Sequence, residues 1–214
     1  MARRKFASTK GASSMDIEIR KLTPSLVEEY ARFHDATPIR DGKEEIHCYC
    51  VSWRSGGWSG ESGHWFPTRE ERREKAIEFV QEGYIQGYLA YYGDEIVGWC
   101  NANTDCRECA DYLRTYWPIE EVRADIKIKS IFCFLIAPEM QRKGIATQLI
   151  ERVCRDAADD GFDFVEACVE KKPRKGATDF MGSTAMYEKC GFSKYAQGKG
   201  KNGRGKIVMR KALK

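Results

Sequence analysis

The chain is predicted to fold as a single α/β domain with a layered arrangement of helices around a sheet. Short stretches that alternate polar and apolar residues take turns with stretches whose apolar residues recur every three to four positions. The predicted order is β-α-α-β-β-β-α-β-α-β, without an internal repeat, which is typical of such a fold. A length of 214 residues, with 42% hydrophobic and 32% charged residues, fits one globular domain of ordinary size.

The first half of the domain begins with a strand and two helices. Residues 16–20 alternate as in a short strand. Thr23-Pro24 then supplies an N-cap residue and a proline for the first helical position. Thr68-Arg-Glu-Glu71 is a capping box that starts the second helix, which runs to Gly83. Two strand-like stretches follow around the turn Gly93-Asp94, so they are predicted to form a hairpin of residues 84–92 and 95–102.

The second half carries three strands and two helices. Residues 126–136 and 162–169 are apolar enough for buried strands, and residues 144–158 between them have helical periodicity. A short helix from Ser183 to Cys190 ends at the C-cap glycine Gly191. Residues 206–213 alternate and close the chain as a strand.

Two segments have no regular pattern. Residues 34–66 carry all three histidines and three of the five tryptophans among many glycines, and residues 103–117 hold Cys106 and Cys109. Long irregular segments inside a compact domain are usually binding loops or lids. Residues 15–214 are therefore expected to be a single domain with an insertion at about 34–66. Residues 1–14 are expected to be a disordered basic arm or a leader, with Met15 as a candidate start.

The charges are unevenly distributed. Residues 1–14 hold four bases and residues 194–214 hold eight, without an acid in either, which leaves 24 bases against 32 acids in residues 15–193. We expect both ends to be solvated tails, and the acidic body to favour cationic small molecules over nucleic acid.

The targeting signals of an exported or membrane protein are missing. No apolar run reaches the roughly 20 residues of a membrane span, and the basic N-terminus lacks the apolar core of a secretory signal. The expected compartment is the cytoplasm, without a membrane partner. The nine cysteines are odd in number and scattered, so we expect reduced thiols.

Phe132 to Ile150 predicts a phosphate site. The apolar strand ends at Pro138, and the turn Gln141-Arg-Lys-Gly-Ile-Ala146 leads directly into a helix. Free N–H groups and the positive end of a helix dipole favour an anion at such a place. The turn is too short for a Walker loop and follows no G-x-G-x-x-G motif, so nucleotide triphosphates and dinucleotides are weakly supported.

A second motif lies about 40 residues downstream, Ser-Thr-Ala-Met-Tyr-Glu-Lys-Cys-Gly-Phe from Ser183 to Phe192. Together with Ile136-Ala-Pro138 and Gln141-x-x-Gly144-x-Ala146 it resembles the two motifs of the Gcn5-related N-acetyltransferase (GNAT) family. The order of elements over nearly the whole domain also fits this family. The resemblance implies an acyl-CoA N-acyltransferase fold, which is a mixed, mostly antiparallel central sheet with helices on both faces.

The resemblance also implies a reaction. A primary amine, on a small molecule or a peptide, would attack the thioester of the co-substrate acetyl-CoA directly, and no metal is expected. The strand backbone at Phe134 and Ile136 would pair with the pantetheine arm. Tyr187 would act as general acid to the CoA thiolate. The turn and the helix starts would hold the rest of CoA, through Gln141, Arg142, Lys143, Gly144, Ile145, Ala146, Thr147 and Ser183.

The general base is open, because an amine that is mostly protonated at neutral pH must first lose a proton. The strand from Ser130 to Ile136 carries no acid, although some family members place a base there. Glu166, Glu170 and Asp125 are the candidates. A second departure is Phe180, at a position where the family often has Asn.

Two alternative functions stay open. The chain could be a CoA-binding sensor or adaptor without turnover. It could instead be a zinc or thiol regulatory module, built on His47 and on Cys48, Cys50, Cys106 and Cys109, with basic ends that touch nucleic acid. A homodimer is also compatible with the sequence.

Overall fold

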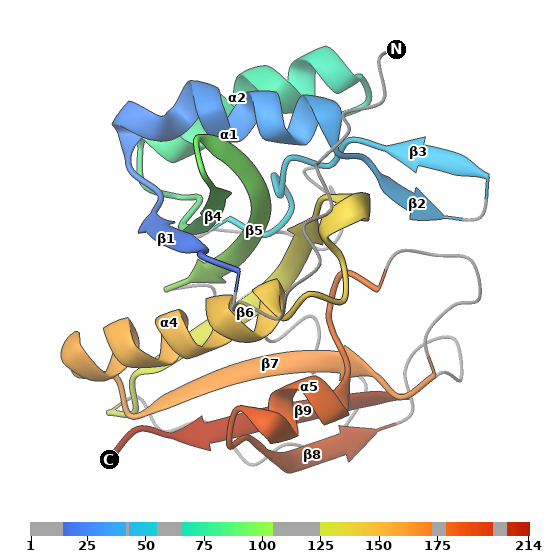
Figure 1. Ribbon diagram of the computed structural model, residues 1–214. Helices are drawn as coiled ribbons and strands as arrows, with labels where there is room; N and C mark the ends of the chain where they lie inside the picture. The colour runs from blue at the N-terminus through green and yellow to red at the C-terminus, as the bar shows by residue number, and fades with distance from the viewer. Residues whose placement is uncertain (1–14, 42, 55–65, 105–124, 173–178, 199–204) are drawn as a thin grey trace.

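A computed structural model describes residues 15–41, 43–54, 66–104, 125–172, 179–198 and 205–214. Seven strands form one sheet in the order β1-β4-β5-β6-β7-β9-β8 (Figure 1). Every neighbouring pair is antiparallel except β6 and β7, which are parallel. The predicted mixed, mostly antiparallel sheet is confirmed. Its strands are β1 Glu18–Lys21, β4 Gly87–Tyr92, β5 Glu95–Asn103, β6 Ile128–Ile136, β7 Phe164–Glu170, β8 Ser193–Gly198 and β9 Lys206–Ala212.

Helices cover both faces of the sheet (Figure 1). They are α1 Val27–Ala36, α2 Arg69–Gln81, α4 Ile145–Asp159 and α5 Thr184–Lys189. Neighbouring residues on β5 show the two faces, because side chains alternate along a strand. Trp99 packs its ring 4.9 Å from that of Tyr30 on α1. A β-carbon on Gly98 would instead lie 3.0 Å from Ile145 on α4.

The helix starts follow the sequence closely. The Thr68 side chain accepts from the Glu71 N–H, and Glu71 bonds back to the Thr68 N–H, which is the predicted capping box of α2. The Ser183 side chain accepts from the Met186 N–H at the start of α5. Thr23 differs, because its hydroxyl pairs with Ser25 and a 3-10 turn, Pro24–Leu26, precedes α1.

Three strands were not predicted. The hairpin of β2 Ile39–Asp41 and β3 Glu44–Ile46 lies inside the irregular segment, and each of its strands has only three residues. β8 is an edge strand whose residues are mostly exposed, and Tyr195 on it is covered by the Arg210 guanidinium, 3.4 Å from the ring centre. Because neither face of β8 is buried, its sequence lacks the alternation that marks a strand.

The prediction that residues 194–214 are a solvated tail is wrong for residues 194–198, which belong to β8, and for residues 205–214. β9 lies inside the sheet between β7 and β8, and its bases have partners. Lys206 pairs with Glu170 and Arg210 with Glu166, and Lys214 after the strand pairs with Asp163. Residues 1–14, the rest of the basic ends at 199–204 and most of the second irregular segment lie outside the described residues.

A β-bulge on β6 parts this strand from β7. Asn101 pairs with Cys133 and Ala102 with Ile131, so Phe132 is an extra residue on β6. Pairing with β7 ends at Ile131, although β6 continues to Ile136 and β7 to Glu170. A bulge bends its strand and increases the twist. The two parallel strands therefore separate toward their C-terminal ends, where α5 follows.

Within the described ranges, no helix combines the length and the apolar character needed to cross a membrane.

Candidate functional site

The turn before α4 presents free donors to solvent. Gly144 is the N-cap residue of α4 with φ +83°, and Arg142 also has a positive φ of 60°. Residues 141–144 are exposed. The first N–H groups of a helix have no intrahelical partner, and among the described residues none accepts from those of Ile145, Ala146 and Thr147. These donors, the helix dipole and two exposed cationic side chains fit a phosphate group.

The turn is fixed to the sheet from below. Ile145 is 1% exposed and packs over Gly98 of β5. The Gln141 side-chain amide donates to the Ile136 carbonyl over 3.3 Å. Gln141 therefore holds the turn against the end of β6, which is a different use from the predicted contact with CoA.

The region where β6 and β7 part is occupied by the segment that leads into α5. The Phe134 N–H donates to the Phe180 carbonyl over 2.7 Å. The Tyr187 hydroxyl donates to the carbonyl of the next residue, Met181, over 3.2 Å. The Phe134 backbone, which the family resemblance assigns to the pantetheine arm, and the Tyr187 hydroxyl, which it assigns as general acid, are thus bonded to successive carbonyls of one segment.

Tyr187 on α5 is fully buried next to the region where β6 and β7 separate. Its ring lies 6.4 Å from that of Phe134 and 5.1 Å from that of Phe192. Burial raises the pKa of Tyr187 well above its ordinary value, with smaller contributions from nearby thiols. The phenol is therefore protonated at neutral pH and can donate its hydrogen.

The three predicted base candidates lie in different environments. Glu166 is buried and forms an ion pair with Arg210, so its carboxylate is committed to that partner, which argues against a role as base. Asp125 precedes the paired start of β6, at the opposite end of this strand from the parted region, which also argues against it. Glu170 ends β7 in the parted region, 3.2 Å from Lys206.

One carboxylate in this region was missed. Asp179 directly precedes Phe180 and is exposed to solvent. Its pKa is nevertheless raised by partial desolvation and by the charge of Glu170, against the hydrogen bonds it accepts from the Gly182 and Met181 backbone. No sequence motif marks it, because it lies in an irregular stretch between β7 and α5.

The described part of the irregular segment at 34–66 lies against the β6 bulge. The Trp53 ring stacks on Phe132 at 5.4 Å, with only 8° between the two planes. The side-chain amides of Asn101 and Asn103 donate to the Trp53 carbonyl over 3.3 and 2.7 Å. The prediction that this segment is a binding loop or a lid stays a prediction, and its placement beside the bulge fits a binding loop.

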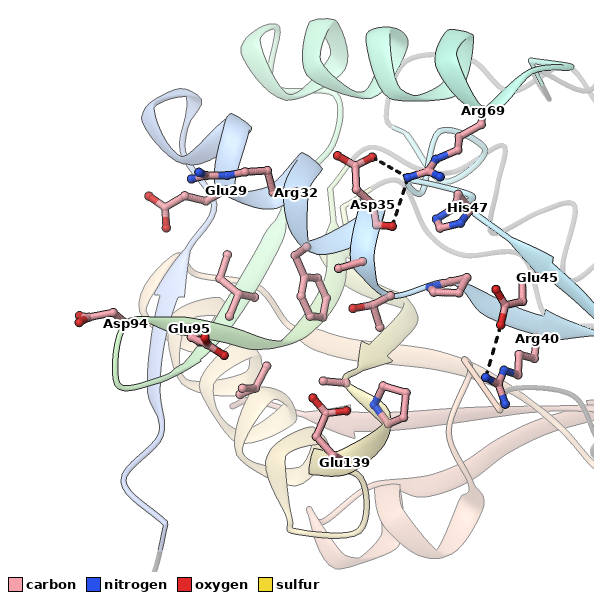
Figure 2. A pocket seen from close by; sticks show the side chains of 18 residues that line it. Glu29, Arg32, Asp35, Arg40, Glu45, His47, Arg69, Asp94, Glu95 and Glu139 are labelled. Atoms are coloured by element: carbon pink, nitrogen blue, oxygen red, sulfur yellow. Dashed lines mark hydrogen bonds and ion pairs between the residues drawn. The ribbon is translucent and has the colours of Figure 1, made fainter. Parts of the chain in front are cut away.

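A separate cavity of about 980 Å³ lies on the other side of β6, toward β5 (Figure 2). The C-terminal half of α1, the β2–β3 hairpin, the start of β5 and the residues after β6 surround it. In Figure 2 two of its acids are paired, Asp35 with Arg69 and Glu45 with Arg40. None of the predicted CoA-binding or catalytic residues lines this cavity, whereas His47 of the zinc or thiol alternative does.

The described residues give little support to the alternative of a zinc site. There, no three His, Cys, Asp or Glu side chains gather in an arrangement that could hold a metal ion. Cys106 and Cys109 lie outside the described residues, so the complete predicted ligand set is not tested.

The chain has been compared with known proteins. The sequence profile of the acetyltransferase (GNAT) family matches residues 49–192, which is about two thirds of the chain. No curated protein matches the chain in sequence.

Solved structures of acetyltransferases share the fold at low sequence identity. An acetyltransferase of the GNAT family from Streptococcus pneumoniae is 16% identical, with a TM-score of 0.54 over 93% of this chain and 100% of that one. Arabidopsis thaliana NAA60 in complex with acetyl-CoA is 14% identical, with a TM-score of 0.54 over 92% and 99%. A mutant of the spermidine N-acetyltransferase SpeG from Vibrio cholerae is 13% identical, with a TM-score of 0.56 over 92% and 94%.

The family profile, the parallel β6–β7 pair that separates at a bulge and the turn of unpaired N–H groups before α4 agree with one another. The chain belongs to the GNAT family of acetyltransferases.

Proposed function

We propose that the protein transfers an acetyl group from acetyl-CoA to a primary amine of a small molecule or a peptide. The proposal depends on one arrangement. The turn before α4 exposes free N–H groups, and Tyr187 is buried beside the region where β6 and β7 separate. The spermidine N-acetyltransferase among the similar structures, together with the acidic body of this chain, supports an amine acceptor.

The turn and the strand would hold the two ends of acetyl-CoA. The N–H groups of Arg142 to Thr147 would bind its diphosphate, and the backbone of β6 would pair with its pantetheine arm. The Phe134 N–H and the Tyr187 hydroxyl would then exchange the carbonyls of Phe180 and Met181 for atoms of the thioester. Binding therefore requires the segment around Phe180 to give way.

The chemistry needs one proton donor and one proton acceptor. The Tyr187 hydroxyl would protonate the departing CoA thiolate, since its raised pKa keeps it protonated. Asp179 would take the proton of the amine, because a carboxylate with a raised pKa is a better base near neutral pH. Glu170 would act as a positioning residue whose charge raises the pKa of Asp179.

Binding is tested with a matched pair of glycine variants. Gly144 and Gly161 lie at the two ends of α4, both have a positive φ, and a β-carbon on either would meet no atom within 4 Å. Alanine at either place costs about 1 kcal/mol of backbone strain. Gly144→Ala should weaken acetyl-CoA binding at least about tenfold in calorimetry, whereas Gly161→Ala should leave it unchanged. Equal affinities would disprove the turn as the diphosphate site.

Turnover is tested with acetyl-CoA and a panel of primary amines, with release of free CoA as the readout. Asp179→Asn should lower kcat/KM strongly. Glu170→Gln should move the acidic limb of the pH profile to lower pH, because it removes the charge that raises the pKa of Asp179. An unchanged profile in both variants would exclude the pair from proton transfer.

A CoA-binding sensor without turnover is the second candidate. It is favoured by the absence of an acid in Ser130 to Ile136 and by the Phe180 carbonyl on the Phe134 N–H. Tight CoA binding without acetyl transfer to any amine would select it.

A further inference from the structure

A pair of buried thiols lies where the loop that carries Trp53 meets the β6 bulge. The Cys50 and Cys133 sulfur atoms lie 2.9 Å apart, although the residues are 83 positions apart in the chain. Their exposed fractions are 1% and 5%. The Trp99 indole N–H also donates to the Cys50 sulfur over 3.3 Å. Both sulfurs are therefore held in contact by the surrounding core.

The backbone conformation that places Cys50 next to Cys133 is strained. Tyr49 and Cys50 both have positive φ angles, 47° and 53°, which residues with a β-carbon rarely adopt. Each such residue costs about 1–2 kcal/mol of strain, and strain of this kind gathers at functional sites. The turn persists because Tyr30 donates to the Tyr49 carbonyl over 2.6 Å and the Tyr49 hydroxyl donates to Asp35.

A third thiol leads from the surface to this pair. Cys48 is partly exposed, and its contact with the Cys50 thiol, together with burial, raises the pKa of Cys48. Burial also raises the pKa of Cys50, so neither thiol reacts rapidly with a reagent in solution. The exposed end of the series is Cys48, and the inner end is Cys133.

We propose that Cys50 and Cys133 form a reversible disulfide by exchange with a low-molecular-weight disulfide, and that Cys48 is the entry point. The Cys48 thiolate attacks the external disulfide, which releases one external thiol and leaves a mixed disulfide. The Cys50 thiolate then attacks the Cys48 sulfur and releases the second external thiol. Finally the Cys133 thiolate attacks the Cys50 sulfur, which restores the Cys48 thiol.

The balance is one external disulfide reduced to two thiols and one protein disulfide formed. The bond ties the loop that carries Trp53 to the strand that carries Phe132, next to the Phe134 N–H. The inference is independent of the proposed acetyl transfer, since it concerns a bond between two residues and can be measured without a substrate.

The test uses the full-length protein in buffers of stepped ratios of oxidised to reduced glutathione. The protein should lose two free thiols, a linked peptide pair containing Cys50 and Cys133 should appear by mass spectrometry, and reduction should reverse both changes. Closure of a long loop should raise the Tm by about 5 °C or more. A bond between other cysteines, or glutathione retained on Cys50, would overturn the proposal.

Cysteine variants complete the test. Cys133→Ser should abolish the loss of thiols and the rise in Tm, with Cys133→Ala as a second variant if the serine is not tolerated. Cys168→Ser is the matched control, because Cys168 lies on the neighbouring strand β7 and is more exposed, and it should behave as the wild type. Cys48→Ser should reach the same disulfide at least about tenfold more slowly. An unchanged rate would remove Cys48 from the route.

Discussion

Acidification from pH 8 to pH 5 is expected to destabilise the fold through one buried histidine. His34 on α1 is 1% exposed and lies among aromatic rings, 4.5 Å from Tyr30 and 5.6 Å from Tyr49. Its Nε2 atom has no hydrogen-bond partner in the part of the chain that the structure describes. Burial lowers the pKa of His34 from 6.5 to about 3. The native state therefore holds this ring neutral.

The magnitude follows from the difference in pKa between the two states. Below pH 6.5 the unfolded chain takes up a proton at His34 that the native state takes up only near pH 3, so the free energy of unfolding falls as the pH falls. At pH 5 this linkage amounts to about 2 kcal/mol relative to pH 8. Carboxylates with lowered pKa, such as Asp35, begin to contribute only at lower pH.

Urea unfolding at pH 5 and pH 8 measures this difference. His34→Gln should lose most of the pH dependence, with His34→Phe as a second variant if the first does not fold. His47 is the matched control, because it is a partly exposed loop histidine whose Nδ1 contacts the His34 carbonyl. His47→Gln should keep the loss of about 2 kcal/mol. A wild-type slope in both His34 variants would refute the reasoning.

Three further variants probe the site and its support. Tyr187→Phe should lower kcat by about 100-fold or more, as expected for a lost general acid. It should lower the free energy of unfolding by only about 1 kcal/mol, because one hydrogen bond is lost. An unchanged kcat would remove the phenol from the mechanism. Glu166→Gln should cost about 3 kcal/mol in urea unfolding, because the partly buried Arg210 loses its counter-charge, while kcat per folded molecule stays unchanged. A large fall in that kcat would restore Glu166 as a base. Gly98→Ala should destabilise the fold by about 1–3 kcal/mol and weaken CoA binding. The new methyl would lie 2.9 Å from Ile136 and 3.0 Å from Ile145, and so would displace the start of α4. Unchanged CoA affinity in calorimetry would contradict a link between Gly98 and the turn.

The elements with local signals were predictable from the sequence. The Thr68 capping box, the short helix that ends before Gly191 and the turn before α4 each depend on residues within a few positions of one another, and the structure confirms these elements. The seven-stranded mixed sheet followed from the family resemblance rather than from periodicity. β8 escaped because its exposed residues do not alternate.

The details of the site depend on contacts between distant segments, so no local pattern could reveal them. The extra residue at Phe132 appears only when β6 is paired with β5. Cys50 meets Cys133, and Phe180 meets Phe134, only in the folded chain. Glu166 illustrates the same limit, since the sequence placed it on a strand but could not provide the Arg210 that neutralises it.

The bulge at Phe132 depends on the number of residues in β6 rather than on their type. A strand reverses the facing of its side chains with every residue, so deletion of one residue here would restore simple alternation along β6. The pairs Asn101–Cys133 and Ala102–Ile131 would then follow one another in an unbroken ladder, and the Phe132 ring that stacks on Trp53 would be lost. The local bend would be lost with it, so β6 and β7 could continue to pair beyond Ile131 and the gap between their C-terminal ends would close.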